Sequence, residues 1–434
     1  MRKLQKFFLL SLMISIASCG ISVSLSQLFL GIAFIFHMSD RDRKKIHPSL
    51  LLFSGFLLFL SFFISFFANH SFSEYRLITK SECKDFLLFS GFILTSGLER
   101  TERETVYKGF KLLLFLLILT GIISVFTKIR LSVILNQPFR NPSGWIYTQH
   151  FGNIGNVGIY LPIGLMNTHL TFGGLLLFFF PYLLFKTVLS LKEKIIHFKS
   201  ALLILLLILF SAVFALNNAR SAMLGAGAAV VIGTLDLVFI KNVFSKRLFS
   251  LFFGTAAALI LSAGFIMYQH PATAKTVRPL LGAEKHTDSG RTFIWSAAFN
   301  IIERHPFLGA GPGNFDIETE KSRKELSLEN SRLLFFYETV QRGHAHNDIF
   351  HILAISGFPG GISFLLLFAG TVSVVWKNRN LKYAPLAYGL AGFFFAGVFQ
   401  CYFQDDETVI VFWYILGFIQ SASADEAHAV LKLH

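Results

Sequence analysis

The side chains best suited to acid–base chemistry stand together at the edge of an apolar run. His344, His346, Asn347 and Asp348 directly precede an apolar stretch that extends from residue 349 to 376. Polar groups in such a place cost several kcal/mol to bury unless they are paired or solvated. Histidine has an ordinary pKa near neutral pH, which lets it take a proton from a neutral hydroxyl group. His346 is therefore our candidate general base.

Two arginines elsewhere in the chain could bind a phosphate. Arg220 opens an apolar run and follows Asn217 and Asn218, and Arg291 opens a stretch with helical spacing. A planar guanidinium donates two parallel hydrogen bonds to a phosphate, and a helix N-terminus attracts anions. Taken alone, Arg220 is better explained as an arginine that extends from a helix end to the membrane surface. Its asparagine neighbours favour a polar site there.

The segment after Arg291 has the pattern of an amphipathic helix followed by a glycine-rich loop. Apolar residues recur at helical spacing up to Arg304, and the pair His305-Pro306 should end the helix. We expect this helix to lie on the membrane. The loop 307–315 reads Phe-Leu-Gly-Ala-Gly-Pro-Gly-Asn-Phe. By itself, such a loop indicates a turn more strongly than a phosphate site.

Two clusters could also hold a metal ion. For His344, His346 and His351, a zinc site would need a third or fourth ligand in a geometry that the sequence does not define. The acidic residues Asp405, Asp406 and Glu407 are better explained as a solvated turn between two spans. We therefore expect no metal, and a divalent cation bound at residues 405–407 would overturn the mechanism expected below.

Two motifs resemble those of known membrane enzymes. His346-Asn347, nine residues and then Gly357-Phe358-Pro359-Gly360 resemble the signature of the bacterial O-antigen ligases, His-[Asn/Ser/Gln]-x9-Gly-x-x-[Gly/Thr/Tyr]. The stretch from Arg291 to Phe315 reads Arg-x3-Trp-x10-Pro-x2-Gly-x-Gly-x-Gly-x-Phe, which is similar to a loop motif that O-antigen ligases share with O-antigen polymerases. The first 200 residues are similar in hydropathy only.

The resemblance implies a reaction and its site. O-antigen ligases transfer a glycan from undecaprenyl pyrophosphate to a sugar hydroxyl of the lipid A core, without a metal, nucleotide or other cofactor. A single displacement would invert the anomeric configuration, with a histidine base and with arginines that neutralise the pyrophosphate. The expected catalytic residues are His346, Arg291 and Arg220. The expected substrate-binding residues are Asn347, Gly311, Gly313, Trp295 and Arg140.

The resemblance also implies a place and partners for the protein. Both substrates are lipids of the outer leaflet of the bacterial inner membrane, so the active site should face the periplasm. The partners are then the lipid-linked glycan, the lipid A-core acceptor and the surrounding membrane lipids. The expected architecture is that of the GT-C glycosyltransferases.

Other functions stay open on the sequence alone. An O-antigen polymerase uses the same donor with a second lipid-linked glycan as acceptor, and a protein O-oligosaccharyltransferase shares the loop motif. A lipid-linked-glycan flippase or other transporter would place charges near mid-membrane and show paired halves, which the sequence lacks. A structural partner of the glycan-export machinery would use the loop only for docking.

Composition indicates that membrane helices must position these residues. Of the 434 residues, 53% are hydrophobic and 15% are charged, and apolar runs of about 20 residues recur. The formal net charge of +14 lies mostly in short loops, which is the positive-inside pattern and argues against nucleic acid as a partner. Cys19 lies inside the first apolar run, so we expect no disulfide framework and no cleavage of Ile16-Ala17-Ser18-Cys19 as a lipoprotein signal.

The runs predict an all-α polytopic membrane protein of about twelve spans with both termini in the cytoplasm. Residues 1–268 would hold spans one to nine, 269–348 a large, partly helical periplasmic loop, and 349–434 spans ten to twelve with a short tail. The apolar run 154–187 is too long for one span and short for two, so we expect one span preceded by an interfacial or re-entrant piece. The expected spans are 4–38 (two), 49–68, 85–98, 108–126, 154–187, 199–216, 221–240, 248–268, 349–376, 384–402 and 408–422.

Overall fold

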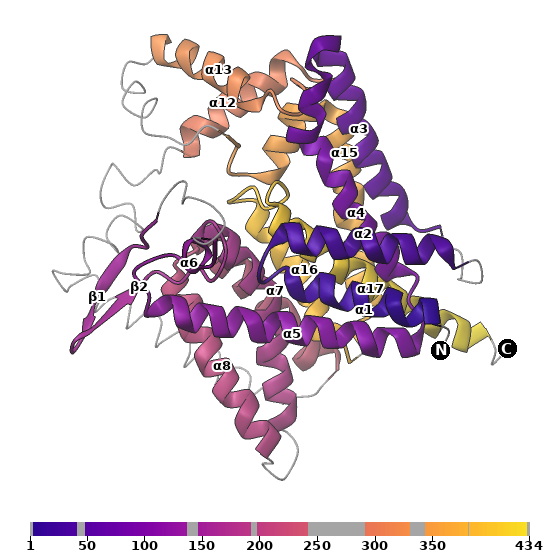
Figure 1. Cartoon of the computed structure of the whole chain (residues 1–434). Coiled ribbons are helices and arrows are strands. Elements are labelled where there is room, and N and C mark those ends of the chain that lie inside the picture. Colours follow the sequence, from indigo (N-terminus) through magenta and orange to yellow (C-terminus); the bar gives the residue numbers. More distant parts are fainter. Residues whose placement is uncertain are drawn as a thin grey trace.

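A computed structural model describes residues 3–40, 48–136, 146–191, 198–241, 291–329, 343–380 and 382–431, and within these all side chains except those of 136, 291, 292, 329 and 424–431. Apolar helices dominate this part of the chain (Figure 1). The elements are α1 (Lys3–Ser18), α2 (Val23–Ser39), α3 (Leu50–Asn69), η1 (Phe72–Lys80), η2 (Glu82–Asp85), α4 (Phe86–Ser96), α5 (Arg100–Val125), α6 (Leu131–Asn136), β1 (His150–Ile154), β2 (Val157–Tyr160), α7 (His169–Leu191), α8 (Phe198–Asn217), α9 (Arg220–Leu235), η3 (Asp236–Ile240), α12 (Arg291–Arg304), α13 (Phe315–Glu329), α15 (Asp348–Lys377), α16 (Ala384–Gly397) and α17 (Asp406–Leu431).

Several of these helices can cross a membrane. Within the described ranges, six are long and apolar enough by composition: α3, α5, α7, α8, α9 with η3, and α15. Helices α2 and α16 are apolar but shorter. A helix overlaps every expected span except 248–268, which lies outside the described residues, but α7 begins only at His169 and α16 ends at Gly397. The chain is a multi-pass helical membrane protein, while the total of twelve spans and the GT-C architecture stay predictions.

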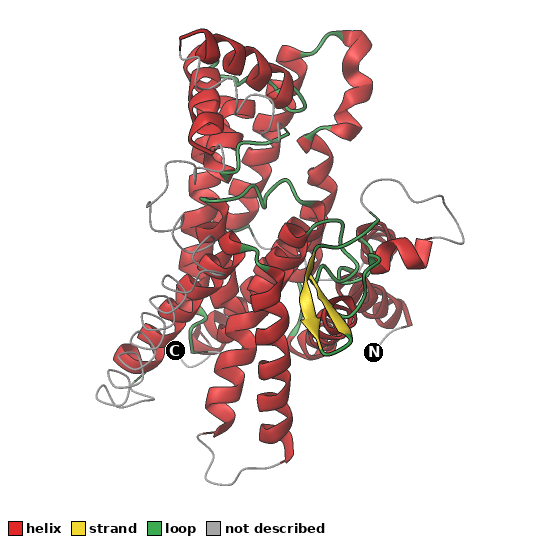
Figure 2. Ribbon diagram, turned by 90° about the vertical axis from the view of Figure 1, so that its left-hand side faces the viewer, coloured by secondary structure: helices red, strands yellow, loops and turns green. Residues whose placement is uncertain are grey.

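The region 146–168 departs from the expected all-helical chain. Strands β1 and β2 form an antiparallel hairpin beside the helices (Figure 2), and a single helix, α7, follows it. Gly155 turns the hairpin with a φ of 60°, a left-handed conformation that glycine adopts without strain. One span after an interfacial or re-entrant piece was expected, and the segment before α7 contains a hairpin whose two strands pair with each other. Helix α7 continues through Pro181.

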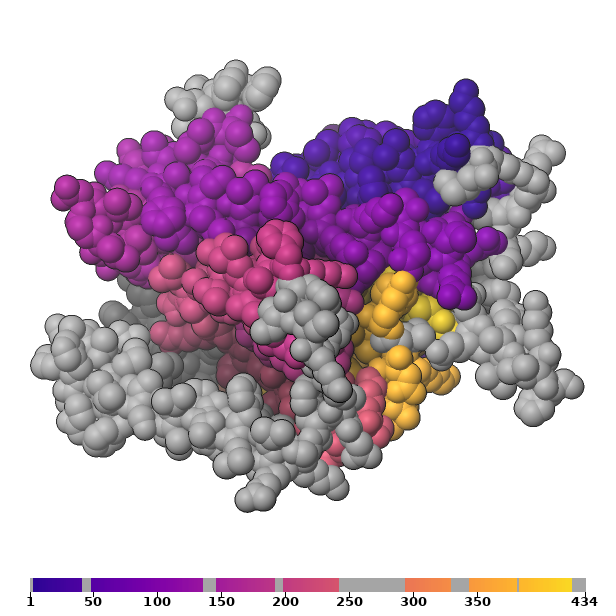
Figure 3. Space-filling model, turned by 90° about the horizontal axis from the view of Figure 1, so that it is seen from below, coloured from indigo at the N-terminus to yellow at the C-terminus, as the bar shows by residue number. Residues whose placement is uncertain are grey.

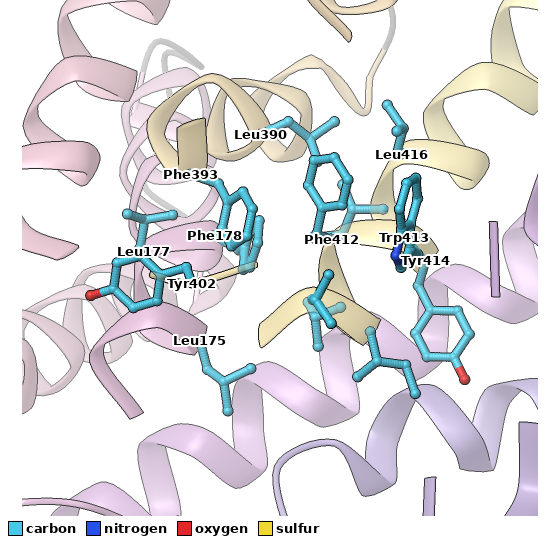
Figure 4. Packing of buried hydrophobic residues seen from close by; sticks show 14 of the residues in the cluster. Leu175, Leu177, Phe178, Leu390, Phe393, Tyr402, Phe412, Trp413, Tyr414 and Leu416 are labelled. Atoms are coloured by element: carbon cyan, nitrogen blue, oxygen red, sulfur yellow. The ribbon is translucent and has the colours of Figure 1, made fainter. Parts of the chain in front are cut away.

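Helix α17 is the centre of the packed core. From Val409 to Ile419 its large side chains have no exposed surface, as expected of a helix that is apolar on all sides. Phe412 stacks on Phe393 of α16 (Figure 4). Trp413 packs edge-on against Phe89 of α4. The neighbouring helices α4, α7, α15 and α16 therefore surround α17. Their packing on α17 fixes their positions relative to one another.

Helices α9 and α16 cross at closely apposed glycines. A Cβ on Gly225 would lie 2.4 Å from the carbonyl oxygen of Gly392, and a Cβ on Gly392 would lie 2.5 Å from the carbonyl oxygen of Gly225. Small residues let membrane helices approach this closely. Gly225 is near the start of α9 and Gly392 near the end of α16, so the crossing places the start of α9 beside the turn that follows α16.

Helices α12 and α13 lie far from the two ends of the chain. Helices α12 and α13 lie at the upper left of Figure 1, and both termini lie at the lower right. Seen from below, α5 runs beside the N-terminal helices, which it contacts through α1 (Figure 3). The segments that carry the motif residues therefore gather at the end of the bundle away from the termini.

Candidate active site

Helix α15 begins at the histidine motif, and Asn347 is its N-cap. The Asn347 Oδ1 accepts a hydrogen bond of 3.0 Å from the Phe350 N–H, as an N-cap side chain should. Its Nδ2 donates to the Val398 carbonyl at 2.9 Å, and its N–H lies 3.3 Å from the Cys401 Sγ. Asn347 is buried, so these bonds fix its position at the start of α15, and the substrate contact expected from the sequence stays a prediction.

His346 is held in an unusual backbone conformation beside Gln400. Its φ is 49°, and Asn218, at 57°, is the other non-glycine residue with a positive φ in the described ranges. Such strain costs about 1–3 kcal/mol and persists where the surroundings enforce it, often at functional sites. His346 is itself an expected catalytic residue, and Asn218 stands two positions before another, Arg220.

The contact with Gln400 sets the tautomer of the neutral His346 ring. The His346 Nδ1 lies 2.7 Å from the Gln400 Oε1. An amide oxygen only accepts, so Nδ1 carries the hydrogen and Nε2 of the neutral ring keeps its lone pair. The His344 ring stands edge-on to it, 4.3 Å away. Burial, followed by the proximity of His346 and His351, lowers the pKa of His344 to about 3, so His344 is neutral at pH 7.

The turn 398–405 between α16 and α17 joins His346 to the start of α9. Gln400 belongs to this turn, because α16 ends at Gly397 and does not reach the expected residue 402. The Phe403 N–H donates to the Asp348 Oδ1 at 2.9 Å, and the Tyr402 hydroxyl lies 3.0 Å from the Ser221 Oγ. Ser221 follows the exposed Arg220. The bonds place the backbone of Arg220 close to the turn that holds His346.

Helix α15 is broken at Gly357, which has a φ of 65° and a ψ of −164°. In an unbroken helix the amide of residue 358 would donate to Ala354, and that of residue 359 to Ile355. Here the Phe358 N–H donates to Pro306 instead, at 2.8 Å, and Pro359 has no N–H. The break therefore leaves two carbonyl groups in the middle of α15 without their helical donors.

The glycine-rich loop supplies the missing donors. The Ala310 N–H donates to the Ala354 carbonyl at 2.8 Å, and the Gly311 N–H donates to the Ile355 carbonyl at 3.1 Å. A Cβ on Gly309 would lie 2.3 Å from the Ile355 carbonyl carbon, so the loop can approach only with glycine there. Gly309 of the loop and Gly357 of α15 are thus explained by the contact of one backbone with another.

The amide groups of this loop are occupied by protein acceptors. The Gly309 N–H donates to the His305 carbonyl at 2.9 Å, and the Gly313 N–H donates to the Glu82 Oε2 at 2.8 Å. Pro312 has no N–H. Gly311 and Gly313 were expected to bind substrate. Their amides instead fix the loop on α15 and on Glu82, so in this arrangement the loop does not present them to a phosphate.

Glu82 in η2 forms a polar cluster that the sequence did not indicate. Its Oε1 accepts a 2.7 Å bond from the Gln404 Nε2 and lies 3.2 Å from the His351 Nε2, while Gln404 and His351 also contact each other. Burial alone would raise the pKa of the Glu82 carboxyl, but the bonds with His351 and Gly313 hold this pKa below its usual value. Glu82 is therefore ionised at neutral pH.

Helix α12 has the bounds expected from the sequence, and protein covers its apolar face. Phe293 lies under the guanidinium of the buried Arg323 on α13, and Phe299 packs against Phe350 of α15 at 4.6 Å. Trp295 stands edge-on to Phe350 at 5.7 Å, and its Nε1 is buried without a hydrogen-bond partner in the described part of the chain. The face expected to lie on the membrane thus packs on α13 and α15, and Trp295 keeps a donor for another ligand.

The acidic turn is tied to neighbouring helices. The Asp405 Oδ2 accepts a 2.6 Å bond from Thr171 of α7, and the Asp406 Oδ2 lies 3.0 Å from the Lys84 Nζ. Burial and the nearby Asp406 raise the pKa of Asp85 well above its ordinary value. Over the described ranges, no three His, Cys, Asp or Glu side chains are grouped so that they could hold a metal ion.

An apolar groove of about 330 Å³ starts beside the histidine motif. Its walls are residues of α9, α15 and α16, and Asp348 is the charged residue that lines it. The wall residues include Ala228, Ile232, Ile349, Phe364, Phe368, Phe394 and Phe395. The three helices that carry or adjoin Arg220, His346 and Gln400 thus also enclose a space suited to a hydrocarbon chain.

The structure brings several of the expected site residues together. His346, Asn347 and Trp295 gather around the start of α15, the glycine-rich loop packs on its break, and Arg220 starts the adjacent helix α9. Arg140 and the side chain of Arg291 lie outside the described residues. Glu82, Gln400 and Gln404 were missed. A sequence signal existed for Gln400, because a glutamine within a run assigned to the membrane is costly unless it has a partner.

Residues 204–365 match the O-antigen ligase family, and this stretch holds the start of α9, the glycine-rich loop and the histidine motif. The match supports assigning the chain to that family. No curated protein matches the chain.

Proposed function

We propose that this chain, as an O-antigen ligase family protein, transfers a glycan from undecaprenyl pyrophosphate to a sugar hydroxyl of the lipid A core. The proposal rests above all on one observation, the 2.7 Å contact between the His346 Nδ1 and the Gln400 Oε1. This contact leaves Nε2 of the neutral ring as a proton acceptor, beside the start of α9. The family match covers the same elements.

In the proposed reaction, His346 is the general base. Its Nε2 takes the proton of the acceptor hydroxyl while that oxygen forms a bond to the anomeric carbon of the donor sugar. The bond from this carbon to the pyrophosphate oxygen breaks, and its electron pair leaves with the pyrophosphate. Because attack and departure occur on opposite sides of the carbon, the product has the inverted configuration. The Nδ1–H bond to Gln400 stabilises the imidazolium that forms.

Arg220 and Arg291 are proposed to neutralise the leaving group. Each begins a helix, α9 and α12, where free N–H groups and the helix dipole add positive potential. The pyrophosphate gains charge as the glycosidic bond breaks, and fixed cations are worth most in a site that excludes water. Arg140 and Trp295 remain proposed substrate contacts.

The apolar groove between α9, α15 and α16 is the proposed place of the prenyl chain. It begins at Asp348, next to the proposed base, and its other named lining residues are apolar. A lipid donor held there would present its pyrophosphate at the outer ends of these three helices. In this proposal the protein lies in the bacterial inner membrane with the site on the periplasmic side, and residues 269–348 form the periplasmic loop.

Complementation of a gene deletion tests the proposal. The deletion should leave core lipid A without long chains while lipid-linked polymer accumulates, and the wild-type gene should restore ligation. His346→Ala should not restore it, although the protein is made and folded. His150→Ala is the matched control, since His150 is exposed in the hairpin and should be dispensable. A single repeat unit on the core in the deletion strain would indicate a polymerase, and full ligation by His346→Ala would exclude this residue as the base.

A further inference from the structure

Glu82 joins three segments that lie far apart in the sequence. Its two carboxylate oxygens contact the Gly313 N–H, the Gln404 Nε2 and the His351 Nε2 at 2.8, 2.7 and 3.2 Å. The side chain is 15% exposed, so solvent competes little for these contacts. The carboxylate is thus a mostly buried acceptor with ligands from the glycine-rich loop, the first turns of α15 and the turn before α17.

Each of these segments continues into a residue of the proposed site. The glycine-rich loop follows α12, which begins at Arg291. His351 is on α15 shortly after His346, and Gln404 shares the turn 398–405 with Gln400. A shift of the Glu82 carboxylate therefore alters the relation between the phosphate-binding helix, the base and the partner of the base. Glu82 itself belongs to η2, between α3 and α4, and its described contacts are with Gly313, Gln404 and His351.

The chemistry of the contacts calls for a carboxylate. Gly313 offers an N–H, and the Gln404 Nε2 is also a donor, so both oxygens of residue 82 must accept. A glutamine at position 82 has one accepting oxygen, which leaves one donor facing an NH₂ group. Removing an acceptor from a buried donor leaves that donor unsatisfied, and the segment that carries it moves to find another partner.

We propose that Glu82 is a positioning residue that sets the glycine-rich loop and the turn 398–405 in register with α15 for glycan transfer. This inference rests on the proposed function. A purely stabilising residue would change the amount of folded protein. A positioning role predicts in addition a lower rate per folded molecule of the variant.

The test compares variants of the purified full-length protein in lipid nanodiscs. The probes are an undecaprenyl-pyrophosphate-linked oligosaccharide and a lipid A-core acceptor, and initial rates of product formation give kcat and KM. Glu82→Gln should lower kcat at least about tenfold, about 1.4 kcal/mol, with the donor KM changed less than about threefold. Glu74→Gln is the control, because Glu74 is an exposed acid in the neighbouring η1 whose bonds go to Ser71.

A double variant provides the rescue. Glu82→Gln combined with Gln404→Glu exchanges the amide and the carboxylate. The amide oxygen at position 82 can then accept from the Gly313 N–H, while its NH₂ group donates to the carboxylate at position 404, which also faces His351. If Glu82→Gln lowers log kcat by a given amount, the double variant should regain at least half of that amount. If Glu82→Gln does not fold, the exchanged variant decides: transfer near the wild-type rate supports the assignment, and a folded but inactive exchange overturns it.

The outcomes separate the two proposals. Wild-type protein that transfers no glycan refutes the proposed function. Wild-type transfer with a kcat for Glu82→Gln within about twofold of normal refutes only the role of Glu82. A change confined to KM also overturns it, because Glu82 would then act in binding rather than in setting the reacting geometry. Equal losses in Glu74→Gln would overturn it as well.

Discussion

Gly357→Ala tests whether the break in α15 holds the candidate site together. Gly357 has a φ of 65° and a ψ of −164°, a region that alanine reaches at a cost of about 1–3 kcal/mol. An added Cβ would also lie 2.5 Å from the carbonyl carbon and oxygen of Phe307. The clash is with backbone, so the loop must move and lose the bond from Phe358 to Pro306, which costs about another 1–3 kcal/mol. The expected destabilisation is about 2–6 kcal/mol.

The same change should reduce transfer more than it reduces folded protein. A displacement of about 1 Å in residues that position a substrate can cost about a hundredfold in rate. Thermal unfolding followed by tryptophan fluorescence in detergent gives the midpoint Tm, and the transfer assay gives the rate per folded molecule. Gly227→Ala on α9 is the matched control. A Cβ there would meet nothing within 4 Å, so it should leave the rate unchanged and raise stability by about 0.5–1 kcal/mol. A Gly357→Ala protein with the wild-type Tm and rate would refute the reasoning.

Three further predictions follow from the same geometry. Gln400→Leu removes the acceptor at the His346 Nδ1 and should lower kcat by about tenfold or more with the protein still folded, which initial rates would show; an unchanged kcat would mean that the tautomer is set otherwise. Arg291→Lys should lose nearly as much transfer as Arg291→Ala, because an ammonium cannot donate two parallel hydrogen bonds, and full activity with Lys would indicate that charge alone suffices. The low pKa of His344, about 3 against an ordinary 6.5, means that between these values the unfolded chain binds a proton that the folded chain does not, so stability falls as pH falls through this window. His344→Asn should therefore lose less Tm than wild type between pH 6.5 and pH 4, and parallel curves would show that another group controls the acid sensitivity.

Hydropathy was sufficient to predict where helices form. The runs at 49–68, 108–126 and 199–216 correspond closely to α3, α5 and α8, because a lipid environment requires each spanning segment to satisfy its own backbone. It was less informative where the chain leaves the apolar interior. Residues 150–160 pair as a hairpin, and α16 ends at Gly397, since the cap and turn bonds that set these limits come from residues distant in sequence.

The site could be predicted in part, for a related reason. His346, Arg220 and the glycine-rich loop carry recognisable residue types at recognisable spacing, and they occupy adjoining elements. Glu82 and Gln404 could not be found in this way. Their importance depends on the buried donors that face them, and Gly313 is 231 positions from Glu82. Gly311 is the converse case, because its motif predicted a ligand contact, which stays a prediction, while its amide donates to the Ile355 carbonyl.

The hydrogen bonds that run directly from the glycine-rich loop to the break in α15 join main-chain atoms, and this has a consequence for how the protein can diverge. These main-chain hydrogen bonds do not depend on which side chains stand later in the sequence, such as the exposed Lys321 and Lys324 of α13. Substitutions on that outer surface can alter its charge and shape without dislodging the loop, since surface changes away from caps and packed contacts usually shift stability by less than about 0.5 kcal/mol. The junction of the loop with α15, which belongs to the proposed site, thus tolerates few replacements. The exposed surface of α13 can vary with the molecules that contact it.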